Sequence, residues 1–320
     1  MSSQDNAIIY FMDLYLTVDV GGTQLRAALY PTDSTKAVRQ MRIPTKGKGT
    51  PLERLLSLLT DIWPANDRVL GIGMALPGPL NPQTGVLFSA PNIPGWENLP
   101  LGSILKERFG VPVFLGNDAN LAGMGEWRYG AARGYHDVLY MTISTGIGGG
   151  VIINDRLLLG HNGLAAELGH VTVLPDGPLC GCGQRGHIES VGSGTGIAHY
   201  VAAELAKGRK SALSGTPSAR DISEAAAAGD ELAGEALARA GHFVGVALAD
   251  FCHIFNPEII ILGGGVSRAG EIFMQPLRTA LEEHVITPAY TRDLKVAHAA
   301  LGDDVGLLGA LALVSTSLPA

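Results

Sequence analysis

Two stretches of the chain decide its fold: LYLTVDVGGTQLRAALY at residues 14–30 and VLYMTISTGIGGGVII at residues 138–153. In each stretch an apolar run of strand character is followed by a glycine-rich turn and a second apolar run, which is the pattern of a β-hairpin. The expected strands are Leu14–Val20 and Gln24–Tyr30, then Val138–Thr142 and Val151–Ile153, with the second turn at 144–150. Because the pattern returns after roughly one domain length, the sequence predicts two similar lobes, each carrying a glycine-rich hairpin.

Strands and helices alternate through the rest of the chain, which favours an α/β architecture. Further strands are expected at Val69–Ala75, Val113–Leu115, Glu258–Leu262 and Leu294–Ala297. Helices are expected at Pro51–Ile62, Ser103–Phe109, Asn117–Tyr129, Glu231–Ile254 and from Gly306 onward. The segment from Leu76 to Gly95 is rich in Pro, Gly and Asn and is expected to be a loop.

Composition narrows the possible functions. Hydrophobic residues make up 46% of the 320-residue chain and charged residues 17%, as in a folded protein rather than a disordered one. The net charge is −7 and no basic run occurs, so a nucleic-acid partner is disfavoured. Three Cys are too few for a disulfide scaffold, and neither a membrane-spanning run nor a signal-peptide pattern occurs. We therefore expect a soluble, cytoplasmic protein with no membrane partner.

Glycine is unusually frequent, with 43 residues, and it gathers in three clusters that each follow an apolar strand pattern. The clusters are Gly21-Gly22-Thr23, the run from Thr145-Gly146 to Gly150, and Gly263-Gly264-Gly265. None of them is a P-loop or a dinucleotide fingerprint, and one cluster alone would be a tight turn. Three clusters favour nucleotide binding, since backbone amides without neighbouring side chains form anion sites. Asp19, just before the first cluster, would place a carboxylate for Mg²⁺ beside the phosphates.

Three short motifs together resemble the ROK family, named for repressors, open reading frames and sugar kinases. They are Asp19-Val20-Gly21-Gly22-Thr23, Gly116-Asn117-Asp118-Ala119-Asn120 with Glu126 after it, and Glu167-Leu168-Gly169-His170 with the cysteine loop that follows. The resemblance extends from about Leu14 to Ala312. It implies the actin-like ATPase (ribonuclease H-like) sugar-kinase fold, with two α/β lobes and a cleft between them that holds ATP and a hexose.

The implied fold divides the chain into parts. Residues 1–12 are expected to be a flexible extension, residues 13–117 plus 305–320 a small α/β lobe, and residues 118–304 a large α/β lobe that carries the cysteine loop. The resemblance also implies a homodimer or a homotetramer.

Asn117 and Asp118 lie where a predicted strand passes into a predicted helix. An Asp at such a junction can cap the helix, or it can act as a general base at the carboxyl edge of the sheet, where α/β sites form. Phosphorylation of a sugar hydroxyl requires removal of its proton as the phosphoryl group arrives, and a positioned carboxylate does this. The resemblance implies that Asp118 is the base and that Asn117 binds a hexose hydroxyl, so the base is favoured over the cap.

His170, Cys180, Cys182 and His187 are spaced H-x9-C-x-C-x4-H within one short stretch. Two thiolates and two imidazoles suit a closed tetrahedral Zn²⁺ site; the alternative is a pair of buried thiols with unrelated surface histidines. A disulfide between Cys180 and Cys182 would be strained, because a single residue separates them. The ROK pattern more often has a third Cys at the position of His187. Cys252, in a predicted apolar helix, is expected in the core.

The resemblance also implies a set of polar residues that hold the sugar hydroxyls. These are Gly78, Asn92, Asn117, Asp118, Glu167, His170 and Glu189. An isolated Glu is by default a surface carboxylate, but Glu167 and Glu189 bracket the metal loop. One nitrogen of His170 on the metal would leave the other facing the sugar. The loop Ala90–Trp96 resembles that of glucokinase-like members, although Trp96 could equally be a packing anchor.

Together these expectations describe an ATP-dependent kinase that phosphorylates glucose at O6, with Asp118 as base and Mg²⁺ anchored by Asp19 through water. The phosphates are expected between Gly21-Gly22-Thr23 and Thr145-Gly146, with the nucleoside beside Gly263, Gly264 and Gly265. Zn²⁺ would be structural. Left open are a kinase for N-acetylglucosamine, N-acetylmannosamine or mannose, and a non-catalytic ROK sugar sensor or repressor.

Overall fold

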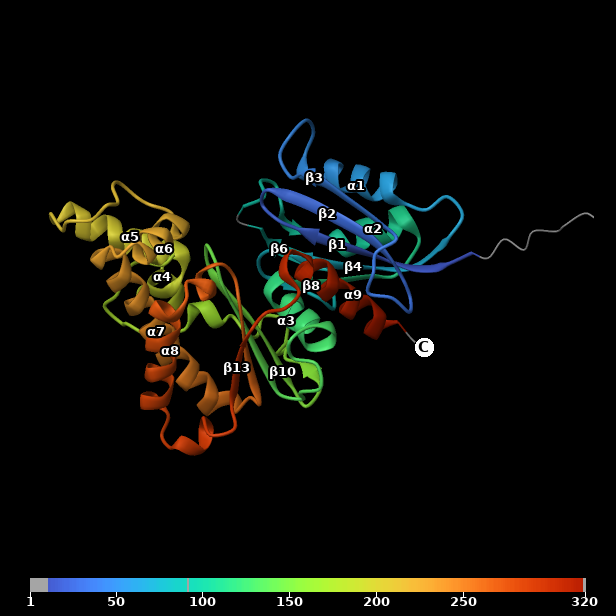
Figure 1. Ribbon diagram of the computed structural model, residues 1–320. Helices are drawn as coiled ribbons and strands as arrows, with labels where there is room; N and C mark the ends of the chain where they lie inside the picture. The colour runs from blue at the N-terminus through green and yellow to red at the C-terminus, as the bar shows by residue number, and fades with distance from the viewer. Residues whose placement is uncertain (1–10, 91, 319–320) are drawn as a thin grey trace, which may run out of the picture. The chain divides into compact units, whose positions relative to one another are not determined.

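Two five-stranded mixed sheets with the same strand arrangement organise the chain, whose computed structural model describes residues 11–90 and 92–318 (Figure 1). The first sheet lies in a unit made of the described residues up to Leu121 and from Asp303 onward, and the second lies in Ala122–Gly302. The sequence-based limits of the lobes differ from these by a few residues. The extension expected over residues 1–12 lies mostly outside the described residues.

The two sheets have the strand orders β3-β2-β1-β4-β8 and β11-β10-β9-β12-β13. The strands of the first sheet are β1 (Asp13–Val20), β2 (Gln24–Pro31), β3 (Arg39–Pro44), β4 (Arg68–Leu76) and β8 (Val113–Asn117). Those of the second are β9 (Val138–Ile143), β10 (Ile147–Ile153), β11 (Arg156–Leu157), β12 (Ile259–Gly263) and β13 (Lys295–His298). In each sheet the first two neighbouring pairs are antiparallel and the last two are parallel. The shared pattern confirms the internal repeat predicted from the sequence.

Local sequence explains where the helices of the first unit begin and end. They are α1 (Pro51–Ile62), α2 (Leu101–Phe109), α3 (Asp118–Tyr129), which continues into the second unit, and α9 (Val305–Ser317). α1 begins at a capping box, in which Thr50 and Glu53 each accept the other's backbone amide, with Pro51 in the first turn. α1 packs on β2 and β3, whereas α9 packs on β1 and β4. Helices therefore cover the first sheet while its carboxyl edge carries the polar residues discussed below.

The segment between Leu76 and Gly95 was expected to be a loop, and this was wrong. It forms most of a three-stranded antiparallel sheet made of β5 (Leu80–Asn81), β6 (Val86–Ser89) and β7 (Glu97–Leu99). Strands of two to four residues are too short to show an alternating pattern, so the Gly and Pro of their turns dominate the sequence signal. β3 was also missed, because an exposed edge strand with two Arg residues resembles a polar loop.

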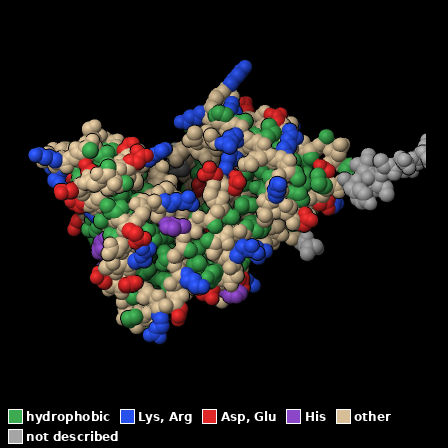
Figure 2. Space-filling model, in the orientation of Figure 1, with side chains coloured by type: hydrophobic (Ala, Val, Ile, Leu, Met, Phe, Trp, Pro, Cys, Tyr) green, Lys and Arg blue, Asp and Glu red, His purple; other side chains and the backbone are tan. Residues whose placement is uncertain are grey.

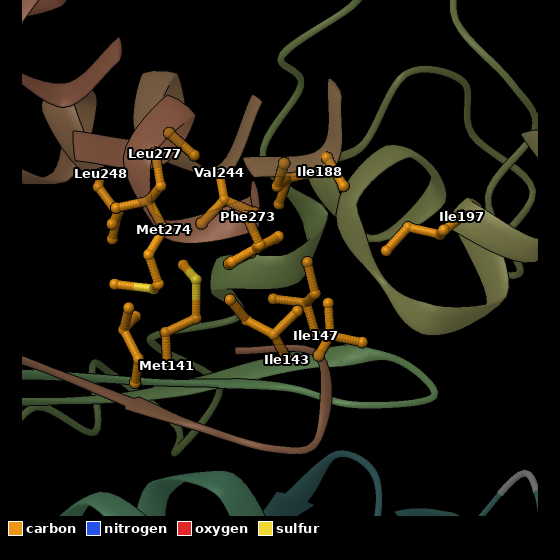
Figure 3. Close-up of a cluster of buried hydrophobic side chains, with 14 of the residues drawn as sticks. Met141, Ile143, Ile147, Ile188, Ile197, Val244, Leu248, Phe273, Met274 and Leu277 are labelled. Atoms are coloured by element: carbon orange, nitrogen blue, oxygen red, sulfur yellow. The ribbon is translucent and has the colours of Figure 1, made fainter. Parts of the chain in front are cut away.

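Five helices accompany the second sheet: α4 (Ile188–Gly192), α5 (Gly194–Ala206), α6 (Ala219–Ala227), α7 (Glu231–Phe255) and α8 (Glu271–His284). Figure 3 shows part of the core of this unit, with labelled side chains Met141, Ile143, Ile147, Ile188, Ile197, Val244, Leu248, Phe273, Met274 and Leu277. α7 and α8 cross closely, because a Cβ at Gly245 would lie 2.2 Å from the carbonyl oxygen of Leu277. The long helix predicted over 231–254 is thereby confirmed as a core helix, and it ends at Asn256 in the left-handed conformation.

The second glycine cluster is only partly a turn, which corrects the expected turn at 144–150. β10 begins at Ile147, so Gly148, Gly149 and Gly150 lie in the strand, opposite residues 140–142 of β9. A Cβ at Gly149 would come within 2.3 Å of the Leu168 side chain. Glycine at this position therefore allows Leu168 to pack on the strand, and the turn itself is confined to residues 144–146.

The face of the molecule in Figure 2 mixes charged, polar and hydrophobic side chains. No helix within residues 11–90 and 92–318 combines the length and the apolar character needed to cross a membrane.

Candidate active site

The carboxyl ends of three adjacent parallel strands meet at one edge of the first sheet. β1 lies beside β4 with Asp19 opposite Ala75, and β4 lies beside β8 with Leu76 opposite Asn117. Since neighbouring strands are about 4.8 Å apart, the ends of β1 and β8 are only two strand spacings from each other. Ligand sites of α/β sheets form at such an edge. The fold therefore brings Asp19 and the Asn117-Asp118 pair to the same edge of one sheet.

The Gly21-Gly22-Thr23 turn between β1 and β2 is fixed from several sides. The Gly21 amide donates to the Gln24 carbonyl at 2.8 Å. Thr45, which is fully buried, donates its hydroxyl to the Gly21 carbonyl at 2.6 Å and its amide to the Thr23 carbonyl at 2.8 Å. A Cβ at Gly22 would lie 2.9 Å from the Cβ of Asn92, so this predicted hexose ligand lies directly against the predicted phosphate turn.

A cavity of about 770 Å³ lies beside this turn. It is lined by Asp19, Gly21, Gly22, Thr23, Gln24, Arg26, Gln40, Arg42, Asp303 and Asp304, all from the first unit. Small-molecule sites have volumes of roughly 300–1,000 Å³. The residues of the first glycine turn, which are predicted to bind phosphates, thus line a cavity of suitable size.

Arg26 joins the charged groups of this cavity, and no sequence motif had singled it out. Its Nε and Nη2 donate to Asp19 Oδ2 at 3.1 Å and 2.7 Å. It also donates to the Asp303 carbonyl and lies 3.6 Å from the Asp304 carboxylate. Because of these contacts, Arg26 neutralises Asp19 in this structure, and a cation at Asp19 would compete with the arginine.

The charge of Asp304 also affects Tyr30. Burial, with the Asp304 charge as a second cause, raises the pKa of Tyr30 to about 12.

Asn117 and Asp118 share the start of α3. The side-chain oxygen Oδ1 of Asn117 accepts the amides of Ala119 at 3.0 Å and Asn120 at 3.1 Å, and its Nδ2 donates to the Gly78 carbonyl at 3.4 Å. Asp118 Oδ1 also accepts the Ala119 amide, at 2.8 Å, while its side chain is exposed. Both residues thus contribute to the cap. Because Asn117 reaches two of the helix amides, Asp118 is not needed for the cap alone, and its role as a base stays a prediction.

The two glycine turns predicted for the second unit lie side by side. Gly263, at the end of β12, pairs with Thr142 of β9. Gly264 has a φ of +83°, and a Cβ there would lie 2.2 Å from the carbonyl oxygen of Ile143. The β9–β10 turn, which contains Thr145, is joined to the start of α5, because the Gly194 amide donates to the Ser144 carbonyl at 2.7 Å. The carboxyl edge of the second sheet therefore carries two adjacent turns, the counterpart of the edge in the first sheet.

Glu189 connects the metal loop to the β9–β10 turn. Its Oε2 accepts the Ile147 amide at 3.0 Å, and a Cβ at Gly146 would lie 2.5 Å from this oxygen. Its Oε1 accepts from the Cys180 thiol at 3.5 Å. Glu167 is exposed, and its carbonyl accepts the His170 amide at 3.1 Å. The structure thus gives Glu189 two contacts that spacing alone did not reveal, and its role in sugar binding stays a prediction.

The four predicted metal ligands come together. Their ligand atoms all lie within 4.8 Å of one another, with His170 Nδ1 and Cys182 Sγ both 3.3 Å from His187 Nδ1. A tight turn presents the thiols, because the Cys180 amide donates to the Gln184 carbonyl at 2.7 Å. Burial raises the pKa of the Cys180 thiol to about 11, although a hydrogen bond from the Cys182 amide acts against it, so a thiolate there needs a cation beside it. The donor set of two sulfurs and two imidazoles fits Zn²⁺.

Glu126 serves the framework, although it belongs to the motif after Asp118. Its side chain is fully buried, and Oε1 accepts the amides of Ala300 and Leu301, both at 2.9 Å. Oε2 accepts the amide of Ala131 at 2.8 Å. One carboxylate thus fastens the end of α3 to the segment that follows β13. Cys252 is buried in α7 as expected.

Two sheets of one topology, each with a glycine turn at its carboxyl edge, define the actin-like ATPase class of α/β proteins. The model of the ROK family matches residues 15–317, and the chain belongs to that family. This confirms the resemblance inferred from the three motifs.

Sugar kinases are among the curated proteins and solved structures to which this chain is similar. A glucokinase of Thermotoga maritima is 37% identical over 305 residues, which cover 93% of this chain and 96% of that protein. A ROK hexokinase from Thermus thermophilus has a TM-score of 0.80 at 34% identity, with 95% of this chain and 99% of that chain covered. A ROK glucokinase from Streptomyces griseus, solved with glucose and AMPPNP, has a TM-score of 0.75 at 32% identity, with 93% and 98% covered.

Proposed function

We propose that this protein catalyses the glucokinase reaction, in which the terminal phosphoryl group of ATP passes to O6 of glucose. The observation that carries the proposal is the shared edge of β1, β4 and β8, where the cavity beside the Gly21-Gly22-Thr23 turn lies two strands from Asn117-Asp118. Membership of the ROK family and the similarity to two glucokinases support the same reaction.

In the proposed mechanism the Asp118 carboxylate accepts the proton of the O6 hydroxyl while O6 forms a bond to the γ-phosphorus. The bond from that phosphorus to the oxygen bridging it to the β-phosphate breaks, and the electron pair stays on ADP. Asp118 suits this role because it is exposed at the sheet edge, while Asn117 accepts the Ala119 and Asn120 amides.

Asp19 is proposed to hold the divalent cation that accompanies the nucleotide, through water. When bound there, Mg²⁺ would neutralise negative charge on the phosphoryl group that is transferred. Arg26 competes for the same carboxylate, and its contacts with Asp303 and Asp304 give it other partners when Asp19 turns to a cation. The Gly21-Gly22-Thr23 turn, which lines the cavity, is proposed to bind the phosphates through the amides of Gly22 and Thr23, because the Gly21 amide already donates to the Gln24 carbonyl and holds the turn in shape.

The remaining site residues keep their proposed roles. Thr145 and Gly146 are proposed to bind phosphate from the second unit, and Gly263, Gly264 and Gly265 to line the nucleoside pocket, which their adjacent turns support. The proposed sugar ligands are Gly78, Asn92, Asn117, Glu167, His170 and Glu189. Asn92 lies against Gly22 of the phosphate turn, and Asn117 donates to the carbonyl of Gly78, another proposed sugar ligand.

His170, Cys180, Cys182 and His187 are proposed to hold a structural Zn²⁺. The ion would keep the loop that carries His170 folded, and it would act through that loop on Glu189, which lies against the Cys180 thiol. It takes no part in phosphoryl transfer in this scheme.

The test is release of ADP over a panel of sugars: glucose, mannose, N-acetylglucosamine and N-acetylmannosamine. We expect turnover with glucose to exceed that with the others. Preferred turnover of another sugar in the panel would move the assignment to that sugar's kinase. Tight sugar binding with no turnover of any sugar would make the protein a sensor.

A further inference from the structure

A row of three charged side chains crosses the first sheet from β1 to β3. Asp19 of β1 lies opposite Arg26 of β2, and Arg26 lies opposite Arg42 of β3. Residues opposite each other in a sheet point to the same face, and all three line the cavity beside the glycine turn. The cavity therefore has two arginines side by side on its wall.

The two arginines differ in what neutralises them. Arg26 is bonded to Asp19 and lies near Asp304, whereas the Arg42 side chain forms no ion pair and donates no hydrogen bond within residues 11–90 and 92–318. Like charges directly opposite each other in a sheet are destabilising. Arg42 has no acidic partner, so its repulsion with Arg26 destabilises this pair of strands, and a bound anion would relieve that repulsion.

The two arginines of β3, Arg39 and Arg42, lie on opposite faces of the sheet. Side chains alternate along a strand, so Gln40 and Arg42 face the cavity, and both line it. Arg39 faces the other way, and its Nη2 donates to the Asp61 carbonyl of α1 at 2.9 Å. Figure 2 shows further Lys and Arg side chains over the region of β3 and the loop that follows it. Arg26 and Arg42 thus lie beside Asp19 on one face of the sheet, and the other acidic residues that line the cavity, Asp303 and Asp304, lie at Arg26.

We propose that Arg42 is a further donor-binding residue, which contacts the phosphate chain of the phosphoryl donor from the β3 side of the cavity. A guanidinium matches phosphate oxygens in a two-pronged geometry, and it recognises their charge rather than a base or a sugar. Arg42 lies two strand spacings, about 10 Å, from Asp19, so a chain of phosphates held by the glycine turn lies within reach of its long side chain. The proposal rests on the proposed function in one respect, that the donor occupies this cavity.

The test is calorimetric binding of MgATP, of tripolyphosphate and of glucose to the natural protein and to two variants. Arg42→Gln removes the proposed contact, and Arg39→Gln is the matched control, since it removes an exposed arginine from the other face of the same strand. Because Arg42 is exposed and donates no bond within the described residues, its variant is expected to fold, which thermal unfolding checks.

We expect Arg42→Gln to raise the Kd of both MgATP and tripolyphosphate by about ten-fold or more, as for loss of one charge-assisted contact. The Kd of glucose should stay unchanged, and Arg39→Gln should bind all three ligands as the natural protein does.

Two outcomes would overturn the proposal: equal loss in both variants, or an Arg42→Gln protein that keeps its affinity for tripolyphosphate. Neither outcome affects the proposed function. If instead the natural protein binds MgATP but phosphorylates no sugar, the proposed function fails while the binding comparison still decides the role of Arg42.

Discussion

Replacement of Glu126 by Gln probes the buried carboxylate that fastens the end of α3. The carboxylate accepts three backbone amides, two on Oε1 and one on Oε2. Gln keeps one carbonyl oxygen for the Ala300 and Leu301 amides, but its NH₂ group then faces the Ala131 amide, donor against donor. The variant therefore loses one hydrogen bond to a charged group, worth about 1.5–3 kcal/mol, and leaves the amide of the half-buried Ala131 without this acceptor.

We expect the free energy of unfolding to fall by about 2–3 kcal/mol in urea titrations followed by circular dichroism. Glu224→Gln is the control, because Glu224 is exposed and only its ion pair with Arg220 is lost, which costs about 0.5 kcal/mol or less. Hydrogen exchange gives a local measure, since the amides of Ala300 and Leu301 should exchange faster in Glu126→Gln alone. An unfolding free energy equal to that of the control, with unchanged exchange at residues 300 and 301, would refute the assigned role of this carboxylate.

Three further predictions address the turn, the metal loop and the surface. Thr45→Val, which removes the hydroxyl bonded to the Gly21 carbonyl, should raise the KM for ATP, whereas Thr45→Ser, which keeps the hydroxyl, should leave that KM unchanged; an equal KM for ATP in the two variants would contradict this. Cys182→Ser should lower the zinc content measured by atomic emission well below about one ion per chain, and an unchanged content would argue against the four-ligand site. The hydrogen bond to Asp155, followed by its charge, raises the pKa of His136, so this pair stabilises the fold below the unfolded pKa of His and the contribution is lost as pH rises through the raised value. The Tm difference between the natural protein and Asp155→Asn should therefore shrink from about pH 6 to pH 8, and a constant difference would contradict the assignment.

The hairpins, the α/β class and the metal loop were readable from the sequence because each is a local pattern. The Gly21-Gly22-Thr23 turn follows directly on an apolar run, and His170 to His187 fall within one short stretch. The residues that act together in each of these features lie close together in the sequence, so their spacing alone predicts the feature.

The residues that support the site could not be found in this way. Thr45 and Arg42 reach the glycine turn and its cavity only because β3 lies beside β2, and β3 itself has the polar composition of a loop. No motif in the sequence marks Arg26 as a site residue. Its role follows from its position in β2, two residues after Gln24, where it lies opposite Asp19. Glu189 was found as a polar neighbour of the metal loop, but its bond to the Ile147 amide depends on packing between segments far apart in sequence.

The glycines show a related ambiguity. Gly148, Gly149 and Gly150 were expected in a turn, yet they lie in β10, where Gly149 makes room for Leu168. A run of glycine in sequence signals either a bend or a close approach of another side chain, and only the packing partner distinguishes the two.

The most direct measurement of the central claim is the steady-state rate of glucose-dependent ADP formation by Asp118→Asn, beside equilibrium binding of glucose to the same variant. The amide preserves shape but cannot accept the O6 proton, so we predict a fall in kcat of ~10² to 10⁴ with little change in glucose affinity. A variant that turns over glucose as fast as the natural protein would contradict the account, since some other group would then take the proton.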